Sequence, residues 1–469
     1  MLQSDLRSSY WHIFLMKLLA LTFFFLISIN TLSSTVAILD NGVDYTHQDL
    51  SNNIYRNIHE LENGRDDDRN GYIDDILGWN FVKMNNEVFD FTREVYLTRK
   101  IERYYILRAK KSLGTISEEE TKEYNELKKD KELKKKRSEF VSWMHGTHVA
   151  GIAANTDSLP EEISSSDIEL VSITYLGSAE FGPALAPSFE RINSNNVSEQ
   201  KKHLKKYWIS FLKWQLNKFK LGVDYAASKA SVVNGSFGQS FEGIQSRIKS
   251  YYKKQFNEDL SDKVSFQQTK DFMEELIKES TKILKKHSNT LFIFSAGNKN
   301  NDSDIYIHFP SAIRLENSLS IGASFDYMEM AYFSNFGKKT VDIFAPGMAI
   351  KSTIPRQEYL RTNGTSQAAP FVSNIAVKAL SQAKRLNIKL KINELKRIIL
   401  ETSLKLEDLK LKSVSEGIIF PERIYQAIRY LKKYTVSEAI SKSKIKYPTK
   451  AVATKKLNTD GLLLELPTN

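Results

Sequence analysis

The sequence predicts an α/β protein in which a mainly parallel central sheet is flanked by helices. Two observations lead to this prediction. After Ser34, short apolar runs typical of buried strands alternate with longer segments of helical pattern, as a parallel sheet requires. The chain also has 469 residues, of which 41% are hydrophobic and 26% charged, so it can bury a large core. This length fits one large domain with additions or two smaller domains.

The strands of the predicted sheet are five short apolar runs. Each is expected to be a fully buried strand, because it is a nearly continuous apolar run between longer helical segments. The runs span residues 35–39, 168–174, 230–234, 290–295 and 319–322.

Helix start signals lie between these runs. Ser117 and Glu120 predict a capping box before a helix that starts acidic and ends basic, at residues 134–137. Ser265 and Gln268 predict the start of another helix. Stretches rich in Lys, Glu and aromatic residues are expected to be helical insertions into a compact core; they span about 82–140, 181–221 and 241–289. The basic stretch 433–469 has no strong periodicity and is expected to be a loosely ordered tail.

Composition excludes several kinds of chemistry and favours no charged partner. The chain has no cysteine, which excludes a thiol nucleophile, an iron–sulfur cluster and a cysteine-based zinc site. Its formal net charge of +11 is compatible with binding to nucleic acid or to an anionic membrane. However, the excess Lys and Arg lie mostly in a few helical stretches, and there is no nucleic-acid motif. We therefore expect solvated helix faces and no nucleic-acid partner.

The N-terminus has the pattern of an export signal. Arg7 and Lys17 precede the apolar run 18–29, and small polar residues follow at 30–34. The run is short for a membrane span, which needs about 20 residues. Residues 1–34 are thus predicted to be a signal peptide, with a retained membrane anchor as the second interpretation and a buried core helix as the third. A secreted or cell-envelope protein is expected.

Three segments carry residues suited to nucleophilic catalysis. Asp40 directly follows the strand at 35–39, and Gly42 permits the tight turn that places this acid at the carboxyl end of the sheet. His145 opens the segment His-Gly-Thr-His-Val-Ala-Gly, where it is expected to begin a helix and to be accessible for proton exchange. A metal pair formed with His148 is the alternative, but no third ligand lies nearby, and His148 is taken as structural.

Ser366 lies in the third segment, Asn-Gly-Thr-Ser-Gln-Ala-Ala-Pro, which spans residues 363–370. The small residues and Pro370 predict the first turn of a helix, where the positive end of the helix dipole would face a developing oxyanion. By itself, such a turn is more often only a helix cap.

Together the three segments resemble the signature motifs of the subtilisin (subtilase) family, in the family's order Asp, His, Ser. The resemblance implies a three-layer fold over residues 35–432 and a serine endopeptidase that acts on proteins or peptides, expected as a monomer. Ser366 would be the nucleophile, His145 the general base and Asp40 the residue that orients it. The segment 292–298 resembles the strand that ends in the oxyanion-hole asparagine, which implies that role for Asn298. The segment 233–238 resembles the strand whose edge pairs with an extended substrate, which implies that Ser236, Phe237 and Gly238 line the cleft.

An acidic loop at residues 64–75 predicts a calcium site. Asp66, Asp68 and Asn70 occupy alternate positions, followed by the Tyr72 carbonyl, as in a calcium loop. The closing Glu of an EF-hand is absent, because that position holds Leu77; Asp74 or Asp75 would close the shell instead, and Asp75 is assigned. An acidic surface turn without metal is the alternative. The predicted cofactor is a structural Ca²⁺ ion.

One feature departs from the family pattern. Subtilases normally carry a folding-assistant propeptide and a helical segment before the first strand, whereas here the signal-like region runs almost directly into Thr35. Either the propeptide is absent or the sequence is truncated. An exported, non-catalytic binding protein with a subtilase fold is therefore kept as the alternative function.

Overall fold

The computed structural model describes residues 34–177 and 185–449, and its centre is a ten-stranded sheet. The strands are β1 (Ser34–Asp40), β2 (Gly78–Asn80), β3 (Ile168–Thr174), β4 (Val232–Gly235), β5 (Leu291–Ser295), β6 (Ser318–Phe325), β7 (Glu329–Met330), β8 (Ile343–Pro346), β11 (Leu404–Lys405) and β12 (Gly417–Ile418). They are ordered β11-β12-β8-β6-β5-β4-β1-β3-β2, with β7 beside β6. Only the β11–β12 and β6–β7 pairs are antiparallel. β9 (Ile350–Ile354) and β10 (Glu358–Thr362) form a separate antiparallel hairpin. The five predicted strands are confirmed as parts of β1, β3, β4, β5 and β6.

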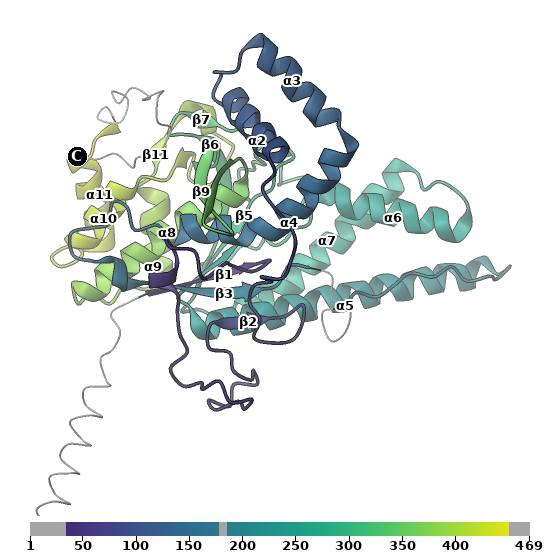
Figure 1. The fold of residues 1–469 in the computed structure, drawn as a ribbon, viewed down its shortest axis with the longest axis horizontal. Helices are drawn as coiled ribbons and strands as arrows, with labels where there is room; N and C mark the ends of the chain where they lie inside the picture. The colour runs from purple at the N-terminus through teal and green to yellow at the C-terminus, as the bar shows by residue number, and fades with distance from the viewer. Residues whose placement is uncertain (1–33, 178–184, 450–469) are drawn as a thin grey trace, which may run out of the picture.

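Helices cover both faces of this sheet (Figure 1). They are α2 (Arg99–Ser112), α3 (Glu118–Lys129), α4 (Lys131–Ala153), α5 (Val197–Lys229), α6 (Phe241–Phe256), α7 (Asp262–Leu284), α8 (Thr365–Arg385), α9 (Ile392–Glu401), α10 (Pro421–Tyr430) and α11 (Val436–Lys446). Short 3₁₀ turns lie at Ser51–Asn53, Ser165–Asp167 and Glu407–Leu409.

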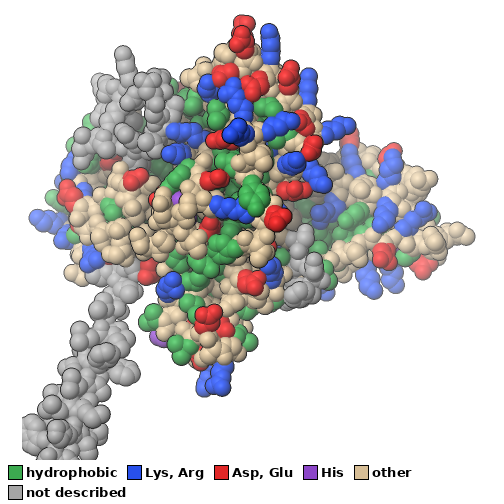
Figure 2. All heavy atoms as spheres, in the orientation of Figure 1, with side chains coloured by type: hydrophobic (Ala, Val, Ile, Leu, Met, Phe, Trp, Pro, Cys, Tyr) green, Lys and Arg blue, Asp and Glu red, His purple; other side chains and the backbone are tan. Residues whose placement is uncertain are grey.

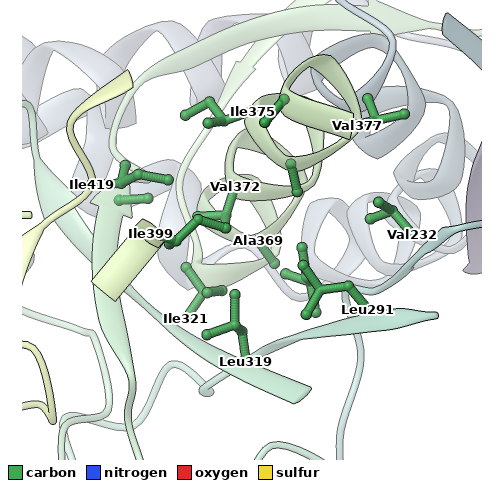
Figure 3. Close-up of a cluster of buried hydrophobic side chains, with 14 of the residues drawn as sticks. Val232, Leu291, Leu319, Ile321, Ala369, Val372, Ile375, Val377, Ile399 and Ile419 are labelled. Carbon is green, nitrogen blue, oxygen red and sulfur yellow. The ribbon is translucent and has the colours of Figure 1, made fainter. Parts of the chain in front are cut away.

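The alternation of side chains along β1 shows how the layers are built. Val36 and Ile38 join the core cluster that includes α4 and α8, whereas Ala37 and Leu39 join the cluster that includes α5 and α7. Successive side chains of a strand point to opposite faces, so a strand that is apolar throughout must be covered on both sides. Figure 3 shows part of the first cluster, where Val372 of α8 lies among apolar side chains of the sheet. The predicted three-layer α/β fold is confirmed.

The stretches expected to be helical insertions are largely helical. The first holds α2, α3 and the start of α4, which pack around their own core with Tyr104, Tyr124 and Phe140. The second leads into the long helix α5, and the third holds α6 and α7. In Figure 1, α2 and α3 lie together above the sheet, and α5 to α7 extend past it on the right. Figure 2 shows Lys and Arg side chains interspersed with Asp and Glu over the visible parts of these helices, as expected for solvated helix faces.

Several local predictions need correction. The Ser117–Glu120 capping box is confirmed, but its helix α3 ends at Lys129, and residues 134–137 belong to α4. The helix expected to start at Ser265 begins one turn earlier, with Ser261 as its N-cap. Ser265 is buried inside that helix because its hydroxyl accepts a hydrogen bond from Gln245 of α6.

The structure tests the prediction for the C-terminal tail but not the prediction for the N-terminal signal segment. Residues 436–446, within the predicted loose tail, form the helix α11, because its Ala439 and Ile440 pack into the core. The predicted signal segment 1–34 lies outside the described residues except for Ser34. Among the described residues, no helix combines the length and the apolarity that crossing a membrane requires.

Candidate active site

Asp40 and His145 are in direct contact. Asp40 is the last residue of β1 and therefore lies at the carboxyl end of the sheet. Its carboxylate is fully buried, and its Oδ1 accepts a hydrogen bond from Nδ1 of His145 at 2.8 Å. The His145 side chain remains 17% exposed, so a molecule in the adjoining cavity can reach the ring.

His145 does not begin a helix, as the sequence predicted, but lies inside α4. The reason is that α4 has its own start signal further upstream. The side chain of Asp130 accepts a hydrogen bond from the backbone N–H of Leu133 and caps the helix there. The positive end of the α4 dipole is therefore remote from His145, and the local electrostatics of this histidine are set by Asp40.

Asn41, which the sequence analysis did not single out, is hydrogen-bonded to α4 beside His145. Its Nδ2 donates to the carbonyl oxygen of Ser142 at 2.6 Å, and its Oδ1 accepts from the N–H of Gly146 at 2.8 Å. In a regular helix these two backbone groups bond to each other, since they are four residues apart. The Asn41 amide bonds to both and ties the turn that carries His145 to the end of β1. The signal available in the sequence was its position directly after the candidate acid.

Two glycines allow β1 and α4 to approach this closely. Gly42 has a φ of +100°, and a Cβ added there would lie 2.6 Å from the carbonyl oxygen of Val88. A Cβ on Gly146 would collide with the carbonyl oxygen of Gly42. The tight turn predicted at Gly42 is confirmed, and Gly146 allows α4 to lie against this turn.

The two histidines of this helix have opposite electrostatics. Burial alone would lower the pKa of His145, but the charge of Asp40 and the hydrogen bond to it outweigh burial, and the pKa is raised above 6.5. Burial lowers the pKa of His148 to about 4, and its Nε2 donates to the carbonyl oxygen of Leu360 at 3.0 Å. His148 is thus a neutral residue that holds α4 to the β9–β10 hairpin, consistent with a structural role.

Ser366 is the second residue of α8, as expected for a serine at a helix N-terminus. Pro370 lies in the second turn rather than the first. Because proline has no N–H, the carbonyl oxygen of Ser366, four residues earlier, has no helical donor. The hydroxyl of Ser236 donates to it instead, at 3.0 Å. In return, the Ser366 hydroxyl donates to the carbonyl oxygen of Ser236 at 3.1 Å. The hydroxyl of the nucleophile candidate therefore points to the segment that directly follows β4, and no hydrogen bond between Ser366 and His145 occurs among the described residues.

Asn298 follows β5 and faces the start of α8. Its Oδ1 accepts from the N–H and the hydroxyl of Thr365, at 2.8 and 3.0 Å. These two bonds fix the orientation of the amide, so Nδ2 remains as the donor. Nδ2 lies 3.5 Å from the position that a Cβ on Gly364 would occupy, beside the turn that carries Ser366. No hydrogen-bond acceptor of Nδ2 is found among the described residues, so this donor is free for a ligand.

A cavity of about 710 Å³ joins these groups. Its lining includes all the predicted catalytic and substrate-binding residues except the buried Asp40, namely His145, Ser366, Asn298, Ser236, Phe237 and Gly238. Residues of α5 also line it. His308 also lines it, and sequence reasoning missed this residue because it lies in a loop with no recognisable pattern. Its ring packs so closely on Gly238 and Gly297 that a Cβ on either would overlap it. Burial lowers the pKa of His308 to about 4, so it presents a neutral imidazole to the cavity.

The first insertion reaches the serine turn directly. Arg108 of α2 donates to the carbonyl oxygen of Asn363 at 3.4 Å, and the Asn363 amide donates to the hydroxyl of Ser112 at 2.5 Å. Asn363 also accepts from the N–H of Ala349 at 2.7 Å. α2 therefore helps to hold the segment that leads into Ser366.

The acidic loop folds so that its side chains accept its own backbone N–H groups. Asp66 accepts from Asn70 and Gly71, and Asn70 accepts from Tyr72. Carboxylate and amide oxygens of this kind suit a hard cation. Glu60, which sequence reasoning missed, places a carboxylate oxygen within 4.8 Å of those of Asp68 and Asp75.

The carboxylate of Asp75 is already engaged by other side chains. Its Oδ2 accepts from the Tyr225 hydroxyl at 2.7 Å and from Asn70 Nδ2 at 3.1 Å, and it pairs with Lys229 Nζ at 2.9 Å. Asp75 is fully buried, and only 9% of the Lys229 side chain is exposed. A cation bound by Asp75 would have to share it with the Lys229 ammonium. Lys229 Nζ also lies 3.7 Å from Oδ2 of Asp68, so that carboxylate is shared with the same ammonium. Lys229 gave no local signal, because it lies at the far end of α5.

The fold and the cavity define an α/β protein with an Asp–His pair at the end of a parallel strand and a serine at a helix N-terminus. The sequence profile described as the Subtilase family, peptidase S8, matches residues 33–418. The chain therefore belongs to the subtilase family.

Curated relatives show the same similarity. Subtilisin-like protease 1 of Plasmodium berghei (strain Anka) is 25% identical over 406 residues, which cover 81% of this chain and 48% of the relative. Subtilisin-like protease 2 of Plasmodium falciparum (isolate 3D7) is 24% identical over 279 residues, covering 59% of this chain and 16% of the relative. The chain thus spans less than half the length of these relatives. The protease domain of PatA, solved as a mutant, has a TM-score of 0.44 and 18% identity, covering 86% of this chain and 98% of that domain.

Proposed function

We propose that the protein is a serine endopeptidase that hydrolyses peptide bonds in proteins through Asp40, His145 and Ser366. The observation that carries the proposal is the cavity at the carboxyl end of the sheet. His145, which is hydrogen-bonded to Asp40, lines this cavity together with Ser366 and Asn298. Acyl transfer requires groups of this kind at one cavity: an oriented imidazole, a hydroxyl at a helix N-terminus and an amide donor.

In the proposed reaction, Oγ of Ser366 attacks the scissile carbonyl carbon and His145 accepts the hydroxyl proton. The imidazolium then gives this proton to the leaving amine, so the peptide C–N bond breaks and an ester to Ser366 remains. Water, activated by the same histidine, hydrolyses the ester. Asp40 holds the Nδ1–H tautomer and stabilises the imidazolium, in keeping with the raised pKa of His145.

Ser366 has to change its hydrogen bond before it attacks. Its hydroxyl donates to the carbonyl oxygen of Ser236, so a rotation about the Cα–Cβ bond is needed to reach His145. Ser236 lies on the edge expected to pair with an extended peptide, and a peptide N–H donating to this carbonyl would displace the hydroxyl. Catalytic hydrogen bonds often form only in the complex with substrate, so this geometry is compatible with catalysis.

Asn298 and the backbone N–H of Ser366 would bind the oxyanion. Asn298 Nδ2 is left as a donor because Thr365 occupies Oδ1. Removing one such donor costs about 3–4 kcal/mol of transition-state stabilisation in related sites.

A fluorophosphonate probe tests this proposal, because it reacts only with an activated serine. The folded protein is expected to be labelled, Ser366→Ala is expected to lose labelling, and Ser117→Ala, at the remote cap of α3, is expected to keep it. If folded wild-type protein is not labelled, the proposal is refuted.

The alternative, a non-catalytic binding protein, is favoured by one observation: the Ser366 hydroxyl donates to Ser236 and not to His145. This alternative predicts that peptides bind to the cavity without being cleaved and that Ser366→Ala binds them as well as the wild type. Peptide binding together with the absence of labelling would support it.

The proposal includes a structural Ca²⁺ ion held by Asp66, Asp68, Asn70 and the Tyr72 carbonyl. Its role would be to neutralise the crowded carboxylates of the loop. A ligand that binds only the folded state at 100 times its Kd stabilises that state by about 2.7 kcal/mol. Calcium is thus expected to raise the melting temperature relative to EGTA, and Asp66→Ala should remove most of this rise. An unchanged melting temperature would exclude a stabilising calcium site.

Export is proposed from the sequence alone, because residues 18–29 have the pattern of a signal peptide. The partners would then be protein or peptide substrates outside the cytoplasm. Mass spectrometry of the secreted form would show whether the first 34 residues are removed.

A further inference from the structure

The charged side chains that line the cavity are all basic. His145, Lys218 and Lys299 lie on its wall, and among the described residues that line it there is no Asp or Glu. Asp40 lies behind His145, and its Oδ1 is engaged by the ring and by the N–H of Asn41. A peptide that enters the cavity therefore meets positive charge from side chains that play no part in the proposed chemistry.

Lys218 is the more buried of the two lysines. It projects from α5 and is partly buried, whereas Lys299 is exposed. Its Nζ lies 4.9 Å from the centroid of the Tyr175 ring and 5.7 Å from that of Trp214. No acidic partner of Lys218 is found among the described residues, and desolvation lowers its pKa. Lys220, on the same helix, is exposed and pairs with Asp224.

The two aromatic rings hold the Lys218 ammonium without neutralising it. Ring faces attract a cation, but they carry no net charge. A partly desolvated ammonium without a counter-ion is unfavourable, and an incoming carboxylate would relieve this. A second ammonium or guanidinium at the same place would be repelled.

Lys218 lies close to the edge that pairs with substrate. The Tyr175 ring, over which its Nζ sits, is 5.0 Å from the ring of Phe237, centroid to centroid. Phe237 is the middle residue of the 236–238 edge, and Lys218, Tyr175 and Phe237 line the same cavity. A side chain that projects from an extended peptide on this edge can reach the ammonium.

We propose that Lys218 selects substrates that carry an Asp or Glu side chain in the segment that lies along residues 236–238. Lys218 is in this view a specificity-determining residue of the cleft, supplied by the long helix α5. The inference rests on the proposed function for its biological meaning, but its central claim, preferential binding of acidic peptides, can be tested without catalysis.

The binding experiment uses Ser366→Ala, which retains the cleft and cannot cleave. Peptides identical except at one position, scanned with Glu, Gln and Lys, are titrated by fluorescence anisotropy. At the responsive position the Glu peptide is expected to bind roughly tenfold more tightly than the Gln peptide at low salt. Added salt should reduce this ratio, since the cleft is open to solvent.

Variants at two lysines of α5 identify the responsible charge. Lys218→Met keeps the long apolar stem and should abolish the Glu-over-Gln ratio, and Lys218→Glu should reverse it in favour of the Lys peptide. Lys213→Met, an exposed position of the same helix, is the matched control and should leave the ratio unchanged. Melting temperatures confirm that each variant is folded. The inference is overturned if no scanned position prefers Glu, or if the ratio survives in folded Lys218→Met.

Failure of this inference differs from failure of the proposed function. Wild-type protein labelled by fluorophosphonate but without a Glu preference refutes the role of Lys218 and leaves the protease intact. Acidic-peptide binding that depends on Lys218 in a protein that is not labelled supports the inference and refutes the protease.

Discussion

Replacing Asn41 is expected to impair catalysis far more than stability. Asn41→Ala removes two hydrogen bonds, to the carbonyl oxygen of Ser142 and to the N–H of Gly146. The two groups are four residues apart in α4 and can bond to each other as in a regular helix, which offsets part of the loss. Since a hydrogen bond contributes about 1 kcal/mol net, the loss of stability should be about 1 kcal/mol, or a few degrees in melting temperature.

The effect on rate has a different origin. Without the Asn41 amide, the turn that carries His145 loses its tie to the end of β1 and is displaced. A displacement of about 1 Å in a catalytic group can cost 10²-fold in rate. We therefore expect kcat/KM of Asn41→Ala to fall about 10²-fold. A loss of about 1 kcal/mol cannot produce this fall, because a protein of ordinary stability remains almost fully folded after it.

The assay measures kcat and KM on a fluorogenic peptide, with the concentration of active sites counted by fluorophosphonate, and the melting temperature of the same samples. The matched control is Asn196→Ala. Asn196 caps α5 by accepting from the N–H groups of Ser198 and Glu199, so its loss should cost about 1 kcal/mol. This control should melt at a similarly lowered temperature with unchanged kcat. If Asn41→Ala keeps the wild-type kcat, or if Asn196→Ala loses as much activity, the reasoning is wrong.

Three further predictions concern the same region and the acidic loop. Asp40→Asn removes the charge that raises the pKa of His145, so the acid limb of the pH profile of kcat/KM should move to lower pH, while the rate falls about 10⁴-fold. The direction of this shift follows from the mechanism. Only neutral His145 can accept a proton, so activity rises as the pH rises through the pKa of His145. A lower pKa therefore moves this rise to lower pH. Lys229→Met leaves the buried Asp75 carboxylate without its cation, and differential scanning calorimetry in EGTA should show a loss of about 3 kcal/mol. Gly42→Ala places a Cβ 2.6 Å from a carbonyl oxygen at a φ of +100°, which should destabilise the fold by at least about 2 kcal/mol in chemical denaturation.

Each of the three has an outcome that contradicts it. An acid limb that stays in place in Asp40→Asn would mean that another group titrates. Wild-type stability of Lys229→Met in EGTA would show that the Asp75–Lys229 pair contributes nothing there. A denaturation midpoint of Gly42→Ala equal to that of the wild type would show that the turn relaxes without cost.

The sequence predicted those parts of the molecule in which the local pattern and the tertiary structure agree. The buried strands were recognisable because a strand covered on both faces has to be apolar throughout, as β1 is. The order of Asp40, His145 and Ser366 along the chain was recognisable because each lies in a segment whose neighbours are also constrained by packing. Gly42 and Gly146 are examples, since no larger residue fits at either position.

The misplaced helix starts show where local signals compete. Ser261 and Ser265 are both of a residue type that often caps helices, and only the packing of α7 on α6 decides which of them is the N-cap. His145 was expected at a helix start because the pattern of residues 145–151 suggests a helix that begins there. The cap at Asp130 lies upstream, and the helix continues through Gly146, which packs against the turn after β1, and through Gly151, which packs against β9.

The residues that no pattern revealed are those whose role depends on a partner far away in the chain. Lys229 compensates Asp75 across 154 positions of sequence, and Lys218 reaches the cleft only because α5 runs beside it. Neither contact has a spacing that could be recognised in advance. Chemistry and selectivity are carried by different parts of this protein in our proposals. The proposed chemistry lies on the sheet and on α4 and α8, where packing restricts the sequence. The charge proposed to choose the substrate is carried by α5, where a lysine at the surface of a helix looks like any other until the fold places it in the cavity.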